Sequence, residues 1–297
     1  MKINILKIVL FALFIWNFNG CRQKPQEQVN MDDSNEYIDS TTLSKIVYLL
    51  PSPSELMQVL ADQNVKLKPN LAAPTGIEKN IILSNQQSLI LGVYLTDISY
   101  NILAKNYQTS ISNLNSIQYL SQNLGLNQLI PEKSLRQIEK NINNVDSLDF
   151  IFDDFVQNSF NTISTTGNQE LLSLVAMGVG IESMHFCFES INVETLNDTI
   201  IPFILSQKEI YHNFYLNFLN YNRNKTELKK FINDVSTIYS MYKKDIITDD
   251  KVSVISKGKS DFAIKNTVNP YFNNVNLKRL IDSIEIVRKN LVELKYQ

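Results

Sequence analysis

The chain has 297 residues, of which 44% are hydrophobic and 20% charged, and its formal net charge at pH 7 is −2. A chain of this length can bury a sizeable hydrophobic core. Its 28 lysine and arginine residues are balanced by 30 aspartate and glutamate residues and do not cluster. The composition therefore gives no electrostatic footprint for nucleic acid, and we expect no nucleic-acid partner.

Residues 1–20 are typical of a bacterial signal peptide. Lys2 and Lys7 precede an apolar run, Ile8–Phe18. This run is long enough for the core of a signal peptide and too short to span a bilayer comfortably. We therefore predict that residues 1–20 are removed from the mature protein.

The predicted signal peptide ends in the stretch Phe18-Asn19-Gly20-Cys21, which resembles a lipobox, the motif whose cysteine is acylated in bacterial lipoproteins. Phe18 and Asn19 depart from the commonest form, which has leucine and a small residue there. We predict a lipoprotein anchored by acyl chains on Cys21. The alternative is an ordinary cleaved signal peptide with an incidental cysteine.

Residues 21–40 are polar and aperiodic, which predicts a flexible tether from the membrane to a domain at residues 41–297. In that domain apolar residues recur at helical spacing almost everywhere. Ser52, Pro53 and Glu55 have the pattern of a capping box, which marks the start of the first helix. Further helices are predicted at about 86–104, 109–123, 132–143, 146–165, 169–191, 197–221, 225–245 and 274–295.

One stretch of the domain, residues 246–272, lacks helical periodicity. It could form a small hairpin around Gly258 or a long loop. The only cysteine beyond Cys21 is Cys187, so the mature chain cannot form an intramolecular disulfide bond. We therefore predict an all-α fold, a single multi-helix bundle domain held together by its hydrophobic core.

Three stretches, LGVYLTDISY (Leu91–Tyr100), IEKNINNVDSL (Ile138–Leu148) and AMGVGIES (Ala176–Ser183), resemble a family of uncharacterised all-helical lipoproteins of Bacteroidota. The resemblance covers about residues 50–190. Members of that family often have tryptophan before the Ile-Glu pair, where this chain has Gly180. The resemblance implies a helical fold and a place in the cell envelope, and it implies no reaction.

The two histidines of the chain share a pattern, because Glu182 lies three residues before His185 and Glu209 three residues before His212. Carboxylate-bridged di-metal bundles use this Glu-x-x-His spacing, since residues three apart lie on one helix face. Glu182 and His185 project into a broad apolar arc, so they are candidate metal ligands. A satisfied polar group of the core is the alternative that we favour.

The second Glu-x-x-His pair lies on a different kind of surface. Glu209 shares its helix face with Ser206 and Asn217, which predicts a face in contact with solvent, and His212 lies near the boundary of that face. We therefore do not expect Glu209 and His212 to form half of a di-metal centre.

Asp97 also lies at the edge of an apolar stripe, in the predicted helix 86–104. A buried acid there needs a partner, and tyrosine hydroxyls, an arginine such as Arg136 and a helix N-terminus are the candidates. Alternatively, Asp97, Glu182 and His185 line one buried polar pocket between helices.

No nucleophile elbow, phosphate-binding loop or Cys-x-x-Cys motif is present, and we expect no cofactor. Cys187 lies two residues from His185, so the two side chains diverge on a helix and cannot act as a nucleophile and its base. We interpret Cys187 as a packing residue.

The sequence therefore predicts a lipid-anchored protein of the cell envelope, at the outer membrane and facing the periplasm. We expect it to be a non-enzymatic binding or structural module with an unidentified protein or small-molecule partner. The alternative is a metal-binding bundle that uses Glu182 and His185, and this alternative includes a metal-dependent enzyme.

Overall fold

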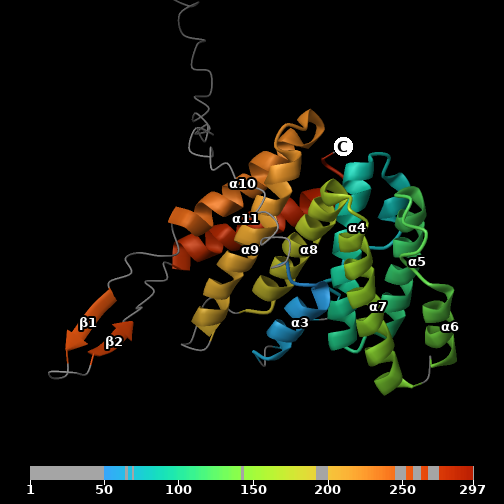
Figure 1. Cartoon of the computed structure of the whole chain (residues 1–297), viewed down its shortest axis with the longest axis horizontal. Helices are drawn as coiled ribbons and strands as arrows, with labels where there is room; N and C mark the ends of the chain where they lie inside the picture. The colour runs from blue at the N-terminus through green and yellow to red at the C-terminus, as the bar shows by residue number, and fades with distance from the viewer. Residues whose placement is uncertain are drawn as a thin grey trace, which may run out of the picture. The chain divides into compact units, whose positions relative to one another are not determined.

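The structure is a computed structural model, and it describes residues 50–63, 66–68, 70–141, 144–191, 200–244, 252–256, 262–266 and 274–296 (Figure 1). All of these belong to one compact unit, Ser40–Gln297. The predicted signal peptide, the lipobox with Cys21 and the tether lie outside the described residues.

The predicted all-α fold is confirmed. The α-helices of the described residues are α3 (Pro53–Ala61), α4 (Ser84–Leu103), α5 (Tyr107–Asn123), α6 (Glu132–Lys140), α7 (Val145–Thr165), α8 (Gln169–Glu189), α9 (Ile200–Asn222), α10 (Lys229–Lys244) and α11 (Asn274–Val292). Two short 3-10 helices, η2 (Ile77–Asn80) and η4 (Thr226–Leu228), precede α4 and α10.

The stretch that lacked helical periodicity contains a hairpin, as one of the two predictions for it proposed. Strand β1 (Val252–Ser256) pairs antiparallel with β2 (Phe262–Asn266), and Val252 lies opposite Asn266 in the register. The turn around Gly258 lies outside the described residues.

Local sequence determines where several helices begin and end. The side chain of Ser52 accepts a hydrogen bond from the backbone N–H of Glu55, and the Glu55 side chain accepts one from the backbone of Ser52, which completes the predicted capping box. Gly125 and Gly167 follow the ends of α5 and α7 with φ of 73° and 76°, a left-handed conformation that suits glycine.

The start of α7 is close to the sequence prediction. The helix was predicted from about residue 146 and begins at Val145, where the side chain of Asn144 caps it by accepting a hydrogen bond from the backbone N–H of Ser147.

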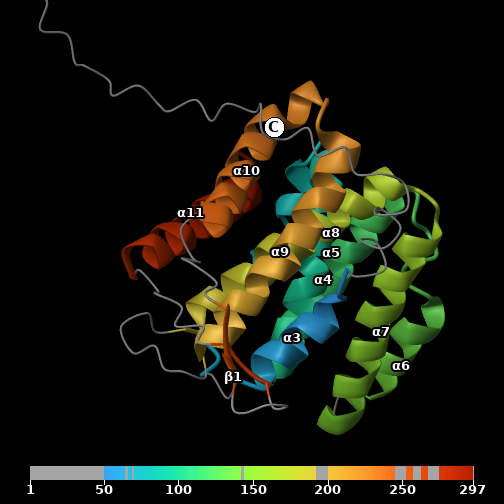
Figure 2. The same ribbon diagram turned by 60° about the vertical axis from the view of Figure 1, so that its left-hand side comes forward.

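Helices α4 and α8 form the centre of the domain. Residues 86–101 of α4 and 171–188 of α8 are buried without interruption. The two helices pack against each other, with α3, α5 and α7 also against α4 and with α9 and α11 also against α8. In Figure 2, α10 and α11 lie side by side at one side of these central helices, and α6 and α7 lie at the other.

By length and composition alone, α8 is apolar enough to cross a membrane. However, every residue of its most apolar 18-residue window is buried inside the domain. A helix that is apolar all round and buried in protein is what a central core helix requires. We therefore assign α8 to the core of the domain.

The backbones of α4 and α8 are in direct contact. A Cβ atom added to Gly92 on α4 would lie 2.0 Å from the carbonyl oxygen of Val175, and one added to Gly178 on α8 would lie 2.0 Å from the carbonyl oxygen of Leu89. Any side chain at either position would collide with backbone, which cannot move aside as a side chain can. The two glycines therefore set the separation of the central helices.

We predict that Gly178→Ala lowers the free energy of unfolding by about 3 kcal/mol, because its Cβ forces α4 and α8 apart. Urea denaturation of the variant and the wild type measures this loss. Gly180→Ala is the matched control on the same helix, because the atoms nearest to its Cβ would belong to the side chain of Phe214, at 3.1 Å, and not to a backbone. We expect a loss of about 1 kcal/mol there, and equal losses in the two variants would contradict the prediction.

Candidate functional site

The structure brings the three predicted site residues together. Asp97 lies on α4, and Glu182 and His185 lie on successive turns of α8. Their exposed fractions are 0%, 0% and 5%. The predicted orientation of Glu182 towards the core is therefore confirmed, and its charge must be compensated within the protein.

Arg288, on α11, supplies this compensation for Glu182. Its Nη2 donates to Oε1 of Glu182 at 2.8 Å, and its Nε donates to Oε2 at 3.1 Å. This two-pronged geometry is the strong form of an arginine–carboxylate pair. The same Nη2 also donates to the carbonyl oxygen of Leu71 at 3.0 Å, so the guanidinium joins α8, α11 and the segment before α4.

His185 forms a second link between α8 and α11. Its Nδ1 lies 2.6 Å from Oε1 of Glu285, and its Nε2 lies 3.3 Å from the carbonyl oxygen of Leu71. A carboxylate and a carbonyl can only accept, so the imidazolium form, with both ring nitrogens as donors, satisfies both contacts.

The electrostatics of the site follow from these contacts. Burial alone would lower the pKa of His185, but the hydrogen bond to Glu285 and the charge of Glu182 outweigh it and raise that pKa above its ordinary value. Burial would likewise raise the pKa of Glu182, but Arg288 and His185 hold it below the ordinary value. Both shifts favour the charged forms of His185 and Glu182.

Asp97 is held by neutral donors. Its Oδ2 accepts hydrogen bonds from the backbone N–H of Ala73, at 3.2 Å, and from Nδ2 of Asn113 on α5, at 3.3 Å. Burial raises the pKa of Asp97 well above its ordinary value, and the negative charge of Glu182 raises it further.

An arginine does act on Asp97, as one of the predictions proposed, but it is Arg288, whose charge lowers the pKa of Asp97, and not Arg136. Arg136 lies on α6, where it pairs with Glu132 at the surface. Neither a tyrosine hydroxyl nor a helix N-terminus donates to Oδ2 of Asp97, because the segment 71–73 crosses beside α4 and provides a backbone N–H instead.

The contacts of Glu182 and His185 do not suit a metal ion. Both oxygens of Glu182 already accept from a guanidinium, whose positive charge lies where a cation would bind. Across the part of the chain that the structure describes, no group of three or more histidine, cysteine, aspartate or glutamate residues is arranged to hold a metal. The donor set fits an ion-pair network better than a metal centre.

The second Glu-x-x-His pair is separate from this network. Glu209 is exposed on α9, as predicted, and the ring of half-buried His212 lies 5.5 Å from that of Tyr239. One residue assigned to the same face was placed wrongly, because Asn217 is fully buried. Packing of α9 against other helices covers Asn217, whereas Ser206 and Glu209 of the same predicted face are exposed.

Sequence reasoning missed Arg288 and Glu285, the two partners on α11. A signal was available, because Arg288 follows Ile284 by four residues and precedes Leu291 by three, which places it on the apolar stripe of its helix. It also missed Glu78, which is buried and accepts from the hydroxyl of Tyr94 at 2.9 Å.

Cys187 behaves as a packing residue, as the sequence suggested. It is buried, and burial raises the pKa of its thiol to about 12. The thiol is therefore neutral and unreactive at physiological pH.

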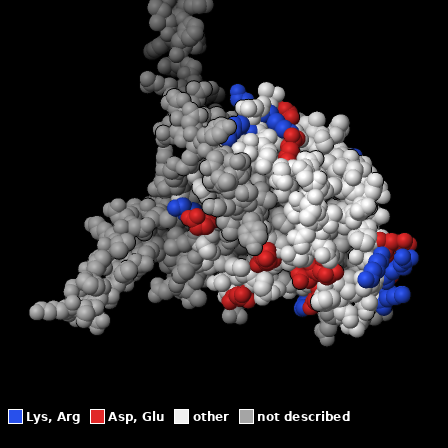
Figure 3. Space-filling model, viewed as in Figure 1, with Lys and Arg blue, Asp and Glu red and all other residues white. Residues whose placement is uncertain are grey.

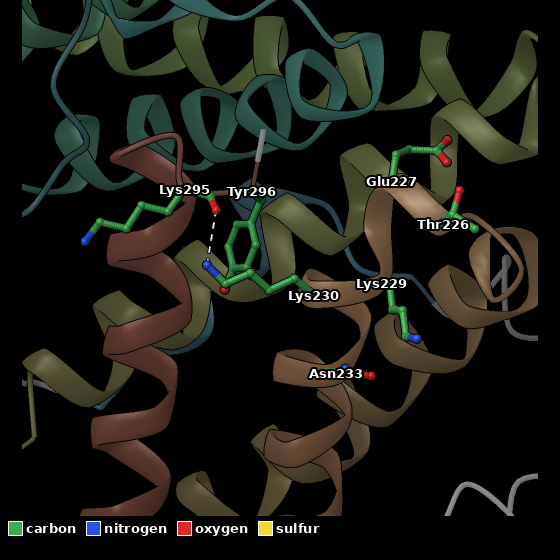
Figure 4. Close-up of a pocket in the computed structure, with 7 residues that line it drawn as sticks. All are labelled: Thr226, Glu227, Lys229, Lys230, Asn233, Lys295 and Tyr296. Atoms are coloured by element: carbon green, nitrogen blue, oxygen red, sulfur yellow. Dashed lines mark hydrogen bonds between the residues drawn. The ribbon is translucent and has the colours of Figure 1, made fainter. Parts of the chain in front are cut away.

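A surface hollow of about 410 Å³ lies between η4, the start of α10 and the end of the chain (Figure 4). Its lining consists of Thr226, Glu227, Lys229, Lys230, Asn233, Lys295 and Tyr296. None of the predicted site residues is among them.

Much of this lining is bonded within the protein. Nζ of Lys230 donates to the carbonyl oxygen of Lys295 at 3.2 Å and lies 5.3 Å from the centroid of the Tyr296 ring. The Tyr296 hydroxyl donates to Asp234, and Nζ of Lys295, which points away from the hollow in Figure 4, pairs with Glu293. The hollow therefore does not gather its lysines around one point.

Because comparisons with known proteins find no match, any assignment of function rests on the fold and on the ion-pair network of Glu182, His185 and Arg288. No protein-family model matches the chain, and no curated protein or solved structure is significantly similar to it. What the structure defines is an all-α domain in which the buried Glu182 and His185 of α8 pair with Arg288 and Glu285 of α11, beside Asp97 of α4.

We predict that Glu182→Ala lowers the free energy of unfolding by about 3–5 kcal/mol, because it leaves Arg288 buried without its counter-charge. Adding Arg288→Met should restore part of that stability, since the double variant removes both charges. Denaturant unfolding of the single and double variants gives the coupling between the two sites.

A control on the same helix is Glu189→Ala, which removes a partly exposed pair with Lys68. We expect it to change stability by less than about 1 kcal/mol. If Glu182→Ala costs no more than Glu189→Ala, the buried pair does not have the role assigned to it.

Proposed function

We propose that the chain is a lipid-anchored protein of the cell envelope whose helical domain is a non-enzymatic binding or structural module. Two lines support this. The sequence at residues 1–21 resembles a signal peptide followed by a lipobox, and the three stretches quoted above resemble helical lipoproteins of Bacteroidota. Acyl chains on Cys21 would attach the domain to the outer membrane, facing the periplasm.

The observation that carries the non-enzymatic part of the proposal is the state of the buried charged groups. A catalytic acid, base or metal ligand needs lone pairs or protons that are available to a substrate. Both oxygens of Glu182 accept from Arg288, and both nitrogens of His185 face oxygens of the protein. These groups are therefore used to connect helices.

The distribution of charge on the surface supports the proposal that the partner is not a nucleic acid. On the face drawn in Figure 3, acidic and basic side chains of the described residues occur in small groups of both signs among uncharged atoms. A basic stripe of the kind that binds phosphate backbones is not visible on this face. The partner of the module is instead an unidentified protein or small molecule.

We predict that cells expressing the full chain incorporate radiolabelled palmitate into it and that Cys21→Ser abolishes the label. The physical reason is that the acyl chains attach to the side chain of Cys21, and serine at that position removes the lipobox cysteine. Cys187→Ser is the matched control and should label as the wild type does. Equal labelling of the Cys21→Ser variant, or no labelling of the wild type, would refute the lipid anchor.

The second candidate is a metal-binding bundle or metal-dependent enzyme, favoured only by the burial of Glu182 beside His185 on one helix. Elemental analysis of protein purified without chelator distinguishes the two. We expect less than stoichiometric iron, manganese and zinc, because Arg288 occupies the carboxylate of Glu182. One equivalent of metal that is lost in Glu182→Ala would reverse the ranking of the two functions.

A further inference from the structure

One oxygen of the buried Asp97 carboxyl group lacks a donor. Oδ1 of Asp97 accepts no hydrogen bond from any donor among the described residues, and Oδ1 of its neighbour Asn113 is likewise without a partner. The other oxygen of the Asp97 carboxyl group, Oδ2, accepts two. An ionised Asp97 would therefore carry a buried, unsatisfied oxygen, which is among the most unfavourable arrangements for a charged group.

The carboxyl group of Glu182, next to Asp97, makes an ionised Asp97 still less favourable. The carboxyl groups of Asp97 and Glu182 lie within hydrogen-bonding reach of each other. Two ionised carboxylates at that separation repel strongly inside a protein, whereas one proton between them turns the repulsion into a hydrogen bond. Glu182 is the member that remains ionised, because both its oxygens accept from Arg288.

The balance of charge in the network also favours a protonated Asp97. When His185 is protonated, Arg288 and His185 supply two positive charges, and Glu182 and Glu285 supply two negative charges. A third negative charge on Asp97 would have no counter-charge in the network. With a proton on Asp97, the network is neutral.

Among the described residues, Arg288 of α11 is the cation that acts on Asp97; it lowers the pKa of Asp97 but is already paired with Glu182. From α5 Asp97 meets the amide of Asn113, and from the segment 71–73 it meets a backbone N–H. The nearby acid Glu78, paired with Tyr94 on α4, adds negative charge to this region.

We propose that Asp97 and Glu182 share a single proton, carried on Oδ1 of Asp97 and donated to the Glu182 carboxylate. The site thus binds a proton where α4, α8 and α11 meet, and holding that proton is part of holding the three helices together. This inference concerns the interior of the domain and does not depend on acylation of Cys21.

The proton makes stability depend on pH in a defined direction. The pKa of Asp97 is raised in the folded state, so above the ordinary aspartate pKa of about 3.9 the folded chain keeps a proton that the unfolded chain has lost. The stability contributed by this proton is present at low pH and falls as pH rises, until the folded carboxyl group itself ionises.

His185 acts in the same direction but at higher pH. Its pKa is also raised in the folded state, so its contribution begins to fall only above the ordinary histidine pKa of about 6.5. Between about pH 5 and pH 6 most of the slope from these two groups therefore comes from Asp97.

The test is Asp97→Asn in the purified, EDTA-treated full chain. An asparagine copies the protonated carboxyl group: its oxygen accepts from Ala73 and Asn113, and its NH₂ donates to Glu182. We expect the variant to fold. The ratio of the wild-type folding equilibrium constant to that of the variant should fall about tenfold from pH 5 to pH 6, which is the effect of one proton.

Two matched variants complete the experiment. Asp153→Asn changes an exposed aspartate of α7, and its ratio to the wild type should stay constant over the same pH range. Glu182→Gln removes the carboxylate that pairs with Arg288, and it should be destabilised at both pH values. A constant ratio for Asp97→Asn between pH 5 and pH 6 would overturn the proposal.

An infrared measurement on the wild type tests whether Asp97 is protonated, even if Asp97→Asn fails to fold. The infrared spectrum at pH 7 should contain the C=O stretch of a protonated carboxyl group, alongside the bands of the ionised aspartate and glutamate side chains. The band should be retained in Asp153→Asn. A wild-type spectrum at pH 7 with no protonated carboxyl band would show that Asp97 is ionised.

Discussion

The ion pair between Arg288 and Glu182 is the interaction on which the arrangement of the domain depends. It connects two residues 106 positions apart in the chain and lies in the interior, where neither charge can be left alone. Such a pair adds little stability over an apolar pair of the same volume, because both charges lose their hydration. The pair instead fixes the position of α11 along α8, because a shift of α11 by one turn would leave Glu182 unpaired.

The close contact of α4 and α8 places the rest of the network. Because Gly92 and Gly178 let the two backbones touch, the polar side chains farther along the same helices are brought together. Asp97 follows Gly92 by five residues and Glu182 follows Gly178 by four, so the contact places one carboxyl group beside the other. Packing and charge are thus two parts of one constraint.

The function proposed for the chain follows from how its polar groups are used. Where a catalytic site keeps acids and bases available, this network satisfies Glu182 and His185 with other residues of the chain. Its position among α4, α8 and α11 suits a module whose helices must keep a fixed geometry while its surface meets a partner. Attachment through Cys21 would bring that surface to the membrane. The support for this attachment is the lipobox-like stretch of the sequence.

The sequence by itself determined the helical class, most helix bounds within a few residues, the capping box at Ser52 and the burial of Glu182, because these follow from local periodicity and capping. Only the tertiary structure decided which groups meet. The partners of Asp97 and Glu182 come from α5, α11 and the segment before α4, and helical spacing says nothing about contacts between distant segments. Burial of Asn217 was missed for the same reason: a polar face indicates solvent only until another helix covers it.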